Sequence, residues 1–272
     1  MRRVLVPLLR CPRCRRGGLL PEVDAPVVLF GPLRCGECRA SYPVAEGVAD
    51  LVVEAPTAGP VRRGLEQRWV ARSFERYVRP VLQRTLTRQS LDRDSEYLLY
   101  RSLLGRPEGP VLDVGCGTGL VARRLAREPD GPAVAGLDVS RAMLEEGVAQ
   151  AREHGATVDF LRAEAPYLPF QDASLGAVLM AGSLHFVEDL SRMMLEVARV
   201  LRPGGRWVAS TYAPPGATAA RVHRRLGLHP RAEAGLRAEA AAVGLVRFER
   251  VALPPLLVVK AEKPAGASGT VR

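Results

Sequence analysis

Lysine is nearly missing from this sequence. Of the 39 basic residues, 37 are arginine, and lysine occurs only at Lys260 and Lys263. So uneven a ratio, beside abundant alanine, glycine, proline and valine, indicates GC-rich coding, and the arginines are spread along the chain. The formal net charge of +10 therefore indicates a solvated basic surface better than a nucleic-acid-binding face. Contact with phosphate stays open.

Long apolar runs are also lacking, since none reaches the ~18–20 residues needed to span a membrane. The opening residues, MRRVLVPLLRCPRC, contain neither a long apolar core nor a small-residue cleavage site, which argues against a secretory signal. We therefore expect a cytoplasmic protein without a membrane span. At 272 residues and 47% hydrophobic, the chain can bury one large core and a small appendage.

Cysteine is scarce outside one cluster. Four of the five cysteines form two C-x-x-C pairs, Cys11 with Cys14 and Cys35 with Cys38. Thiols stay reduced in the cytoplasm, so such pairs indicate a metal more than disulfides. Two matched pairs predict a structural zinc ion held by four thiolates, and a redox pair is the alternative interpretation.

The remaining chain divides by composition and by periodicity. Strand-like apolar runs alternate with segments of helical spacing from residue 110 onward, which predicts an α/β fold with parallel strands. The last two strand-like runs, LVRFERVAL and LLVVKAEKP, are close enough to form a hairpin. We expect a zinc-binding module at 1–53, a linker at 54–64, a helical lid at 65–108, the main domain at 109–263 and a disordered tail at 264–272.

The glycines of VLDVGCGTGL, residues 111–120, raise the question of the ligand. A dinucleotide fingerprint would have a third glycine where Leu120 stands, and no Gly-Lys-Ser/Thr follows for a P-loop. Asp113 would repel a pyrophosphate but suits a cationic amino group. Asp138 ends the next strand, where a carboxylate can accept both hydroxyls of a ribose. A ligand with an amino acid, a ribose and no phosphate is S-adenosylmethionine, and a dehydrogenase is the alternative.

Four ordered motifs, LDVGCGTG, GLDVSRAML, RAEAPYLPF and VARVLRPGGRWV, resemble those of class I S-adenosylmethionine-dependent methyltransferases of the type 11 branch. The resemblance covers about residues 110–263 and implies a Rossmann-like seven-stranded sheet with an antiparallel terminal strand. One departure is SLG at 174–176, where the family usually has SFD. The cofactor-binding residues that this interpretation assigns are Asp113, Gly115, Cys116, Gly117, Gly119, Asp138, Val139, Glu164, Ala165 and Gly182.

The cysteine-containing words LRCPRC and LRCGEC, with SYPVAEGVADL, resemble the zinc ribbon of small activator proteins that partner tRNA and protein methyltransferases. Such ribbons also occur fused to rRNA guanine methyltransferases and to plant plastid methyltransferases. The segment GSLHFVEDLSRMMLEVARVL follows the generic type 11 pattern and places this chain nearer the plastid group.

Methyl transfer depends mainly on alignment of the acceptor, and a base is needed only if the acceptor must lose a proton. His185, after the fourth strand, is the candidate base or orienting group, although a histidine bonded in a helix turn is an equal interpretation. Trp69, Phe74 and Tyr77 are candidate lid contacts. We expect a small-molecule acceptor. The alternatives are an rRNA or tRNA base, or a partner protein with a vestigial methyltransferase fold, and the oligomeric state stays open.

Overall fold

The computed structural model describes residues 1–23, 25–53, 59–87, 92–213 and 216–266. Its centre is a sheet of parallel strands, as the alternating pattern predicts, in the spatial order β7-β6-β5-β8-β9. The five strands are β5 (Val111–Val114), β6 (Val134–Asp138), β7 (Val158–Arg162), β8 (Leu175–Met180) and β9 (Leu201–Tyr212). Their carboxyl ends therefore meet at one edge of the sheet.

Helices alternate with these strands and cover both faces of the sheet. They are α5 (Leu120–Ala126), α6 (Arg141–Glu153) and α7 (Leu190–Val200), with 3-10 turns at Ala165–Tyr167 and Leu184–Phe186. Side-chain caps fix two of the starts: Ser140 accepts from the N–H of Met143 at 3.3 Å, and Asp189 accepts from that of Arg192 at 2.9 Å. Apolar residues recur every three or four positions in α7, so one face of that helix packs on the sheet.

Two cores flank the sheet because alternate residues of a strand point to opposite faces. In β5, Val111 packs with the core that includes Tyr100 of the lid, and Leu112 packs with the core under α7. Asp113 follows on this fully buried strand. The sheet thus carries a carboxylate into the interior just before the glycine loop.

The C-terminal part adds the predicted hairpin. Helices α8 (Ala217–Arg225) and α9 (Glu233–Ala242) precede β10 (Val246–Leu253) and β11 (Leu256–Glu262). Strand β11 runs antiparallel to both β9 and β10. Gly244, with φ of +79°, lies just beyond α9, where a positive φ ends a helix. Of the expected tail, residues 267–272 lie outside the described residues.

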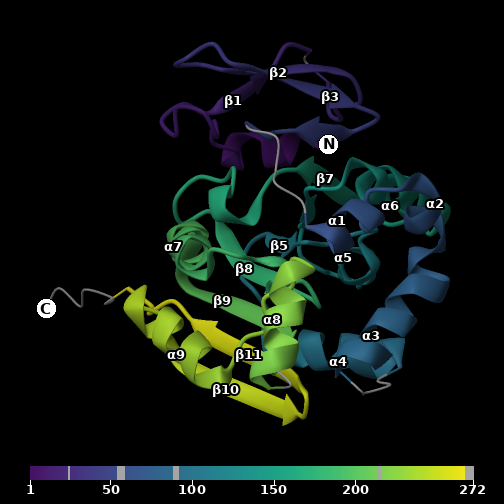
Figure 1. The fold of residues 1–272 in the computed structure, drawn as a ribbon. Helices are drawn as coiled ribbons and strands as arrows, with labels where there is room; N and C mark the ends of the chain where they lie inside the picture. Colours follow the sequence, from purple (N-terminus) through teal and green to yellow (C-terminus); the bar gives the residue numbers. More distant parts are fainter. Residues whose placement is uncertain (24, 54–58, 88–91, 214–215, 267–272) are drawn as a thin grey trace, which may run out of the picture.

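The seven strands expected for the main domain are β5–β11, but the sheet does not end there: four N-terminal strands extend it to eleven. The additional strands are β1 (Leu19–Pro21), β2 (Gly31–Cys35), β3 (Ser41–Ala45) and β4 (Val48–Asp50), which follow a 3-10 turn at Arg3–Leu8. Strand β4 pairs in parallel with β7, with Ala49 opposite Leu161 and Asp50 opposite Arg162. Figure 1 shows the N-terminal strands at one end of the sheet and the hairpin at the other. An otherwise open edge of β7 is thereby covered.

A helical layer lies over the carboxyl ends of the strands (Figure 1). It comprises α1 (Pro60–Leu65), α2 (Arg68–Ser73), a π-helical turn at Phe74–Val78, α3 (Arg79–Thr87) and α4 (Arg93–Leu104). Helix α1 begins inside the range expected to be a linker, of which residues 54–58 lie outside the described part. Pro80 does not interrupt this layer: it is the second residue of α3, directly after the π-helical turn, and the helix continues through it.

Candidate functional site

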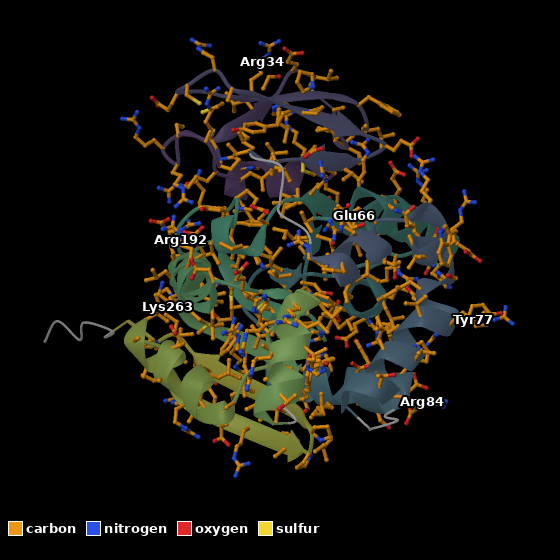
Figure 2. The ribbon with its side chains drawn as sticks, viewed as in Figure 1. Arg34, Glu66, Tyr77, Arg84, Arg192 and Lys263 are labelled. Carbon is orange, nitrogen blue, oxygen red and sulfur yellow. The ribbon has the colours of Figure 1, made fainter. Side chains whose placement is uncertain are left out.

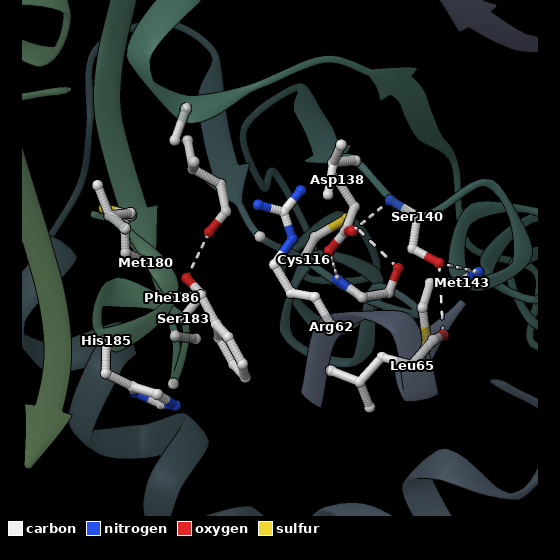
Figure 3. Close-up of a pocket in the computed structure, with 18 of the residues that line it drawn as sticks. Arg62, Leu65, Cys116, Asp138, Ser140, Met143, Met180, Ser183, His185 and Phe186 are labelled. Carbon is white, nitrogen blue, oxygen red and sulfur yellow. Dashed lines mark hydrogen bonds between the residues drawn. The ribbon is translucent and has the colours of Figure 1, made fainter. Parts of the chain in front are cut away.

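A cavity of about 580 Å³ opens at the carboxyl ends of the parallel strands, beneath the helical layer (Figure 3). Nine of the ten residues assigned to the cofactor from sequence line it. The exception is Gly119, at the start of α5, where an added Cβ would lie 2.9 Å from the ring of Phe160. Gly119 therefore serves helix–strand packing.

The glycine loop turns tightly beneath the cavity. The N–H groups of Gly115 and Cys116 both donate to the carbonyl of Leu137, at 2.7 and 3.0 Å. Gly115 has φ of +68°, and a Cβ there would lie 2.5 Å from the Cβ of Ser183. A side chain at this position would have to displace the segment after β8, so the loop geometry requires glycine.

Asp138 is the anchor of this loop. Its Oδ2 accepts from the N–H of Gly117 and its Oδ1 accepts from the N–H of Ser140, each at 2.8 Å. Burial raises the pKa of its carboxyl, and these hydrogen bonds together with the charge of Arg62 lower it. Figure 3 shows Arg62, from α1, reaching into the cavity beside Cys116 and Asp138.

Asp113 is buried at 2% exposure, and its Oδ1 has no hydrogen-bond partner within the described part of the chain. Burial, followed by repulsion from Asp138, raises the pKa of Asp113 to about 7, and the charge of Arg79 opposes this rise. A buried carboxylate without a full set of partners is costly. The cavity therefore offers an unsatisfied acceptor that suits a cationic group.

His185 lies in the 3-10 turn after β8 and lines the same cavity. Its ring is buried and meets the ring of Tyr212 edge-on, with centroids 5.0 Å apart. Burial lowers the pKa of His185 to about 3, so the imidazole is neutral at physiological pH. Its Nδ1 has no partner among the described residues, and the Thr211 hydroxyl on the cavity wall likewise has none.

Sequence reasoning missed a chain of buried polar groups that also lines the cavity. Arg79 pairs with Glu96 at 2.6 Å, and the Tyr100 hydroxyl donates to Glu96 at 3.1 Å. The Ser210 hydroxyl lies 2.7 Å from that of Tyr100 and accepts from the N–H of Gly182 at 2.7 Å. The i, i+4 spacing of Glu96 and Tyr100 was the sole sequence signal for this chain of contacts.

The helical layer is tied to the glycine loop by an ion pair. Glu75 in the π-helical turn accepts from Arg123 of α5 and from the hydroxyl of Thr118. Both ion-pair side chains are largely buried, at 13% and 6% exposure. The helical layer is therefore in contact with the glycine loop and with α5.

Of the three aromatic lid candidates, only Phe74 lines the cavity. Trp69 and Tyr77 are 71% and 59% exposed, and Figure 2 shows Tyr77 projecting away from the molecule. The expectation that these two contact cofactor or acceptor is wrong. Their helix faces point outward, whereas Val70 and Ala71 pack on Met143.

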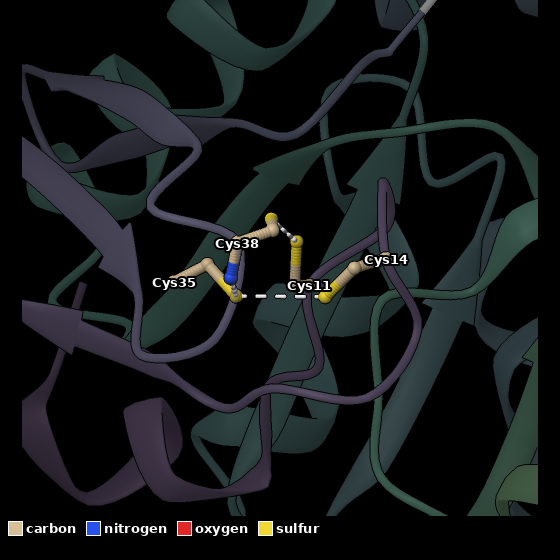
Figure 4. A group of neighbouring side chains, drawn as sticks. All are labelled: Cys11, Cys14, Cys35 and Cys38. Carbon is tan, nitrogen blue, oxygen red and sulfur yellow. Dashed lines mark hydrogen bonds between the residues drawn. The ribbon is translucent and has the colours of Figure 1, made fainter.

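The four cysteines of the N-terminal strands converge on one point (Figure 4). All four Sγ atoms lie within 4.8 Å of one another, with 3.7 Å between Cys11 and Cys38 and 3.6 Å between Cys14 and Cys35. A tetrahedral ion with metal–sulfur bonds of about 2.3 Å requires sulfur–sulfur distances of about 3.8 Å. The donor set and spacing therefore suit such an ion. Cys116 lies apart, half-buried in the glycine loop.

Comparison with known proteins decides which fold carries this site. Residues 111–205 match the family described as a methyltransferase domain. This segment has the fold of a class I methyltransferase domain. It includes β5, the glycine loop, Asp138 and the turn that holds His185.

Curated relatives match mainly this methyltransferase domain. A ubiquinone/menaquinone biosynthesis C-methyltransferase of Desulfotalea psychrophila is 42% identical over 39% of the chain, and a phthiotriol/phenolphthiotriol dimycocerosates methyltransferase of Mycobacterium ulcerans is 41% identical over 35%. These alignments span 43% and 34% of the relatives' own lengths.

A third relative matches beyond the methyltransferase domain. An uncharacterized chloroplastic methyltransferase of Arabidopsis thaliana is 28% identical over 74% of the chain and 61% of its own length. Residues 109–272 make up only about 60% of the chain. The match therefore extends into the residues that precede the methyltransferase domain.

Solved structures share the fold. Phosphoethanolamine N-methyltransferase 2 of Haemonchus contortus, in complex with S-adenosyl-L-methionine, aligns with a TM-score of 0.57 at 17% identity over 63% of this chain and 53% of its own. The [4+2]-cyclase SpnF aligns with a TM-score of 0.59 at 21% identity over 78% and 99%. A methyltransferase domain alone therefore does not fix the reaction. Among the described helices, none is both long and apolar enough to cross a bilayer.

Proposed function

We propose that this chain transfers a methyl group from S-adenosylmethionine to a small-molecule acceptor. The observation that carries the proposal is the pair of carboxylates on either side of the glycine loop in a methyltransferase domain, Asp113 buried and Asp138 half-buried. Among the described residues, no group bonds to the Oδ1 of Asp113, which suits it to a cationic ammonium group. Asp138 ends the neighbouring strand, where a carboxylate accepts from ribose hydroxyls.

We assign other residues that line the cavity to the remaining parts of the ligand. Gly115, Gly117 and Gly182 allow the backbone to approach closely, while Glu164 and the backbone of Ala165 would receive the adenine. When bound, S-adenosylmethionine supplies an activated methyl group on a sulfonium, whose leaving group is already good. The chain's own task is then to orient the acceptor and to exclude water from the cavity.

We assign acceptor orientation to His185. Its neutral ring and its unpartnered Nδ1 suit a hydrogen bond to a polar group of the acceptor. The size of the cavity, about 580 Å³, and the small-molecule names of two of the relatives support an acceptor of that class over an extended nucleic acid. An rRNA or tRNA base is the alternative that the experiment must exclude.

We further propose that the cysteine cluster binds one zinc ion and that residues 1–53 are a ribbon of the methyltransferase-activator type. Four thiolates fill every position of a tetrahedral site, so the ion has no place for water and acts structurally. Its binding energy would stabilise short strands that bury little on their own. Residues 65–108 are the proposed lid and residues 109–263 the proposed methyltransferase unit.

Titration calorimetry with S-adenosylhomocysteine, the demethylated product, tests the cofactor assignment. Asp138→Ala should weaken binding at least about tenfold, because it removes both the ligand contact and the support of Gly117. Glu153→Ala, at the exposed end of α6, is the matched control and should bind normally. Tight binding of NADH with none of S-adenosylhomocysteine would refute the assignment and favour a dehydrogenase.

Incubation of the protein with radiolabelled S-adenosylmethionine and fractionated lysate from a deletion strain tests the acceptor class. We expect label in the small-molecule or organic fraction. Label in RNA alone would show that the acceptor is a nucleic acid. Absence of cofactor binding, together with no label in any fraction, would favour the partner-protein alternative with a vestigial methyltransferase fold.

A further inference from the structure

The segment that carries Tyr167 closes one end of the cavity, and the residues before the first cysteine hold that segment in place. Tyr167 lines the cavity. The N–H of Arg10 donates to the carbonyl of Pro169 at 3.1 Å, and the N–H of Gln171 donates to the carbonyl of Leu8 at 2.8 Å. An isolated antiparallel bridge therefore joins the residues just before Cys11 to the segment that follows Tyr167.

A side chain from the cysteine turn reaches the same wall. The N–H of Arg15 donates to the carbonyl of Cys11 at 2.9 Å, which closes the turn that brings Cys11 and Cys14 to one centre. Arg15 itself has φ of +57°, and its guanidinium lies 4.9 Å from the centroid of the Tyr167 ring. Any ion that fixes this turn also fixes the backbone from which the Arg15 side chain extends, and Glu196, 4.0 Å from its guanidinium, helps to hold that side chain at the ring.

A second path reaches the neighbouring wall through the paired strands. Asp50 at the end of β4 accepts from Arg162 of β7 at 2.9 Å. The Nε of Arg162 donates to the carbonyl of Val139 at 2.9 Å, and Val139 lines the cavity directly after Asp138. Both paths end on residues that line the same cavity, Val139 directly after β6 and Tyr167 in the turn after β7.

We propose that the four-cysteine metal site and the adenosine end of the cofactor cavity are thermodynamically coupled, with Arg15 and Arg162 as the positioning residues. This inference rests on the proposed function. Metal bound at the cysteines holds Tyr167 and Val139 in the arrangement that receives the ligand. Coupling between sites is reciprocal, so bound ligand must tighten metal binding by the same factor.

The test compares zinc-loaded wild type, Arg15→Gln and Arg16→Gln by calorimetry with S-adenosylhomocysteine. Arg16 is the exposed neighbour of Arg15 and serves as the matched control. Arg15→Gln should weaken binding about three- to fivefold, which corresponds to the loss of one partly exposed cation–π contact. The loss should not exceed this, because the guanidinium of Arg192 lies 5.3 Å from the centroid of the same ring and still holds it. Elemental analysis should give one zinc for each of the three proteins.

Competition with a zinc chelator supplies the reciprocal measurement. Saturating S-adenosylhomocysteine should raise the chelator concentration that removes half of the zinc from wild type, and this shift should shrink in Arg15→Gln. If wild type binds the ligand but Arg15→Gln equals Arg16→Gln and the chelator midpoint does not move, the coupling is wrong while the proposed function stands. If wild type does not bind the ligand, the proposed function and the coupling are both refuted.

Discussion

Replacing Asp113 by asparagine should stabilise the ligand-free protein while impairing its ligand binding. Burial and Asp138 raise the pKa of Asp113 from an ordinary 3.8 to about 7. The folded state therefore holds the proton more tightly than the unfolded state. The resulting loss of stability is absent below about pH 4, grows as pH rises to 7 and reaches about 4 kcal/mol at pH 8. Asp113→Asn removes this penalty, and thermal unfolding at pH 8 should show a higher melting temperature.

Ligand binding should respond in the opposite direction. A cationic ammonium pairs with the ionised carboxylate, so binding lowers the pKa of Asp113 and releases a proton. The affinity of wild type for S-adenosylhomocysteine should be full at pH 8 and fall about tenfold for each pH unit below 7, approaching a 100-fold loss at pH 5. Asp113→Asn should bind weakly at both pH values.

Calorimetry in buffers of different ionisation enthalpy measures the released proton directly. Glu153→Gln is the control and should keep the wild-type pH dependence. Equal wild-type affinity at pH 5 and pH 8, together with an unchanged melting temperature for Asp113→Asn, would refute the reasoning about this carboxylate.

Three further predictions concern the loop, the metal and the histidine. Gly115→Ala should destabilise the protein by about 1–3 kcal/mol in urea unfolding and weaken ligand binding, because its Cβ would meet Ser183 at 2.5 Å; wild-type stability would contradict the loop geometry. Cys35→Ser should purify with little zinc by elemental analysis, whereas Cys116→Ala should keep one equivalent; equal zinc in both would contradict a four-cysteine site. The His185 imidazole should stay neutral between pH 5 and 8 in NMR titration, because burial lowers its pKa to about 3; protonation near pH 6.5 would mean that the ring is solvated.

Much of the site could be predicted because its residues lie at or just after strands that the sequence marks by apolar, β-branched runs. Asp113 and Asp138 end apolar, β-branched runs, and parallel strands bring such ends to one edge. The wall built from Arg79, Glu96 and Tyr100 could not be predicted in the same way. Its contacts join helices to a strand more than a hundred residues away, with 110 residues between Tyr100 and Ser210.

The strand count could not be predicted for a related reason. Strand β4 has only three residues, and nothing in Val48–Asp50 marks β7 as its partner. Helical spacing likewise predicted the helices of the lid, but it did not determine which side of each helix faces the cavity. In the structure Trp69 and Tyr77 face outward, whereas Phe74 lines the cavity. The periodicity of apolar residues predicts how wide the apolar face of a helix is. Which residues at the edge of that face are buried depends on how the helix packs against α6, and this cannot be predicted from the periodicity.

The parallel pairing of β4 with β7 sets a condition for any chimera made from this protein. A different zinc-binding module grafted in place of residues 1–53 would have to supply a strand that meets Leu161 and Arg162 in the register now held by Ala49 and Asp50. A graft that lacked it would leave β7 as a bare edge beside the ligand cavity, and bare edges recruit strands from other molecules. Such hybrids should therefore aggregate in proportion to protein concentration even when the grafted module folds and binds its metal.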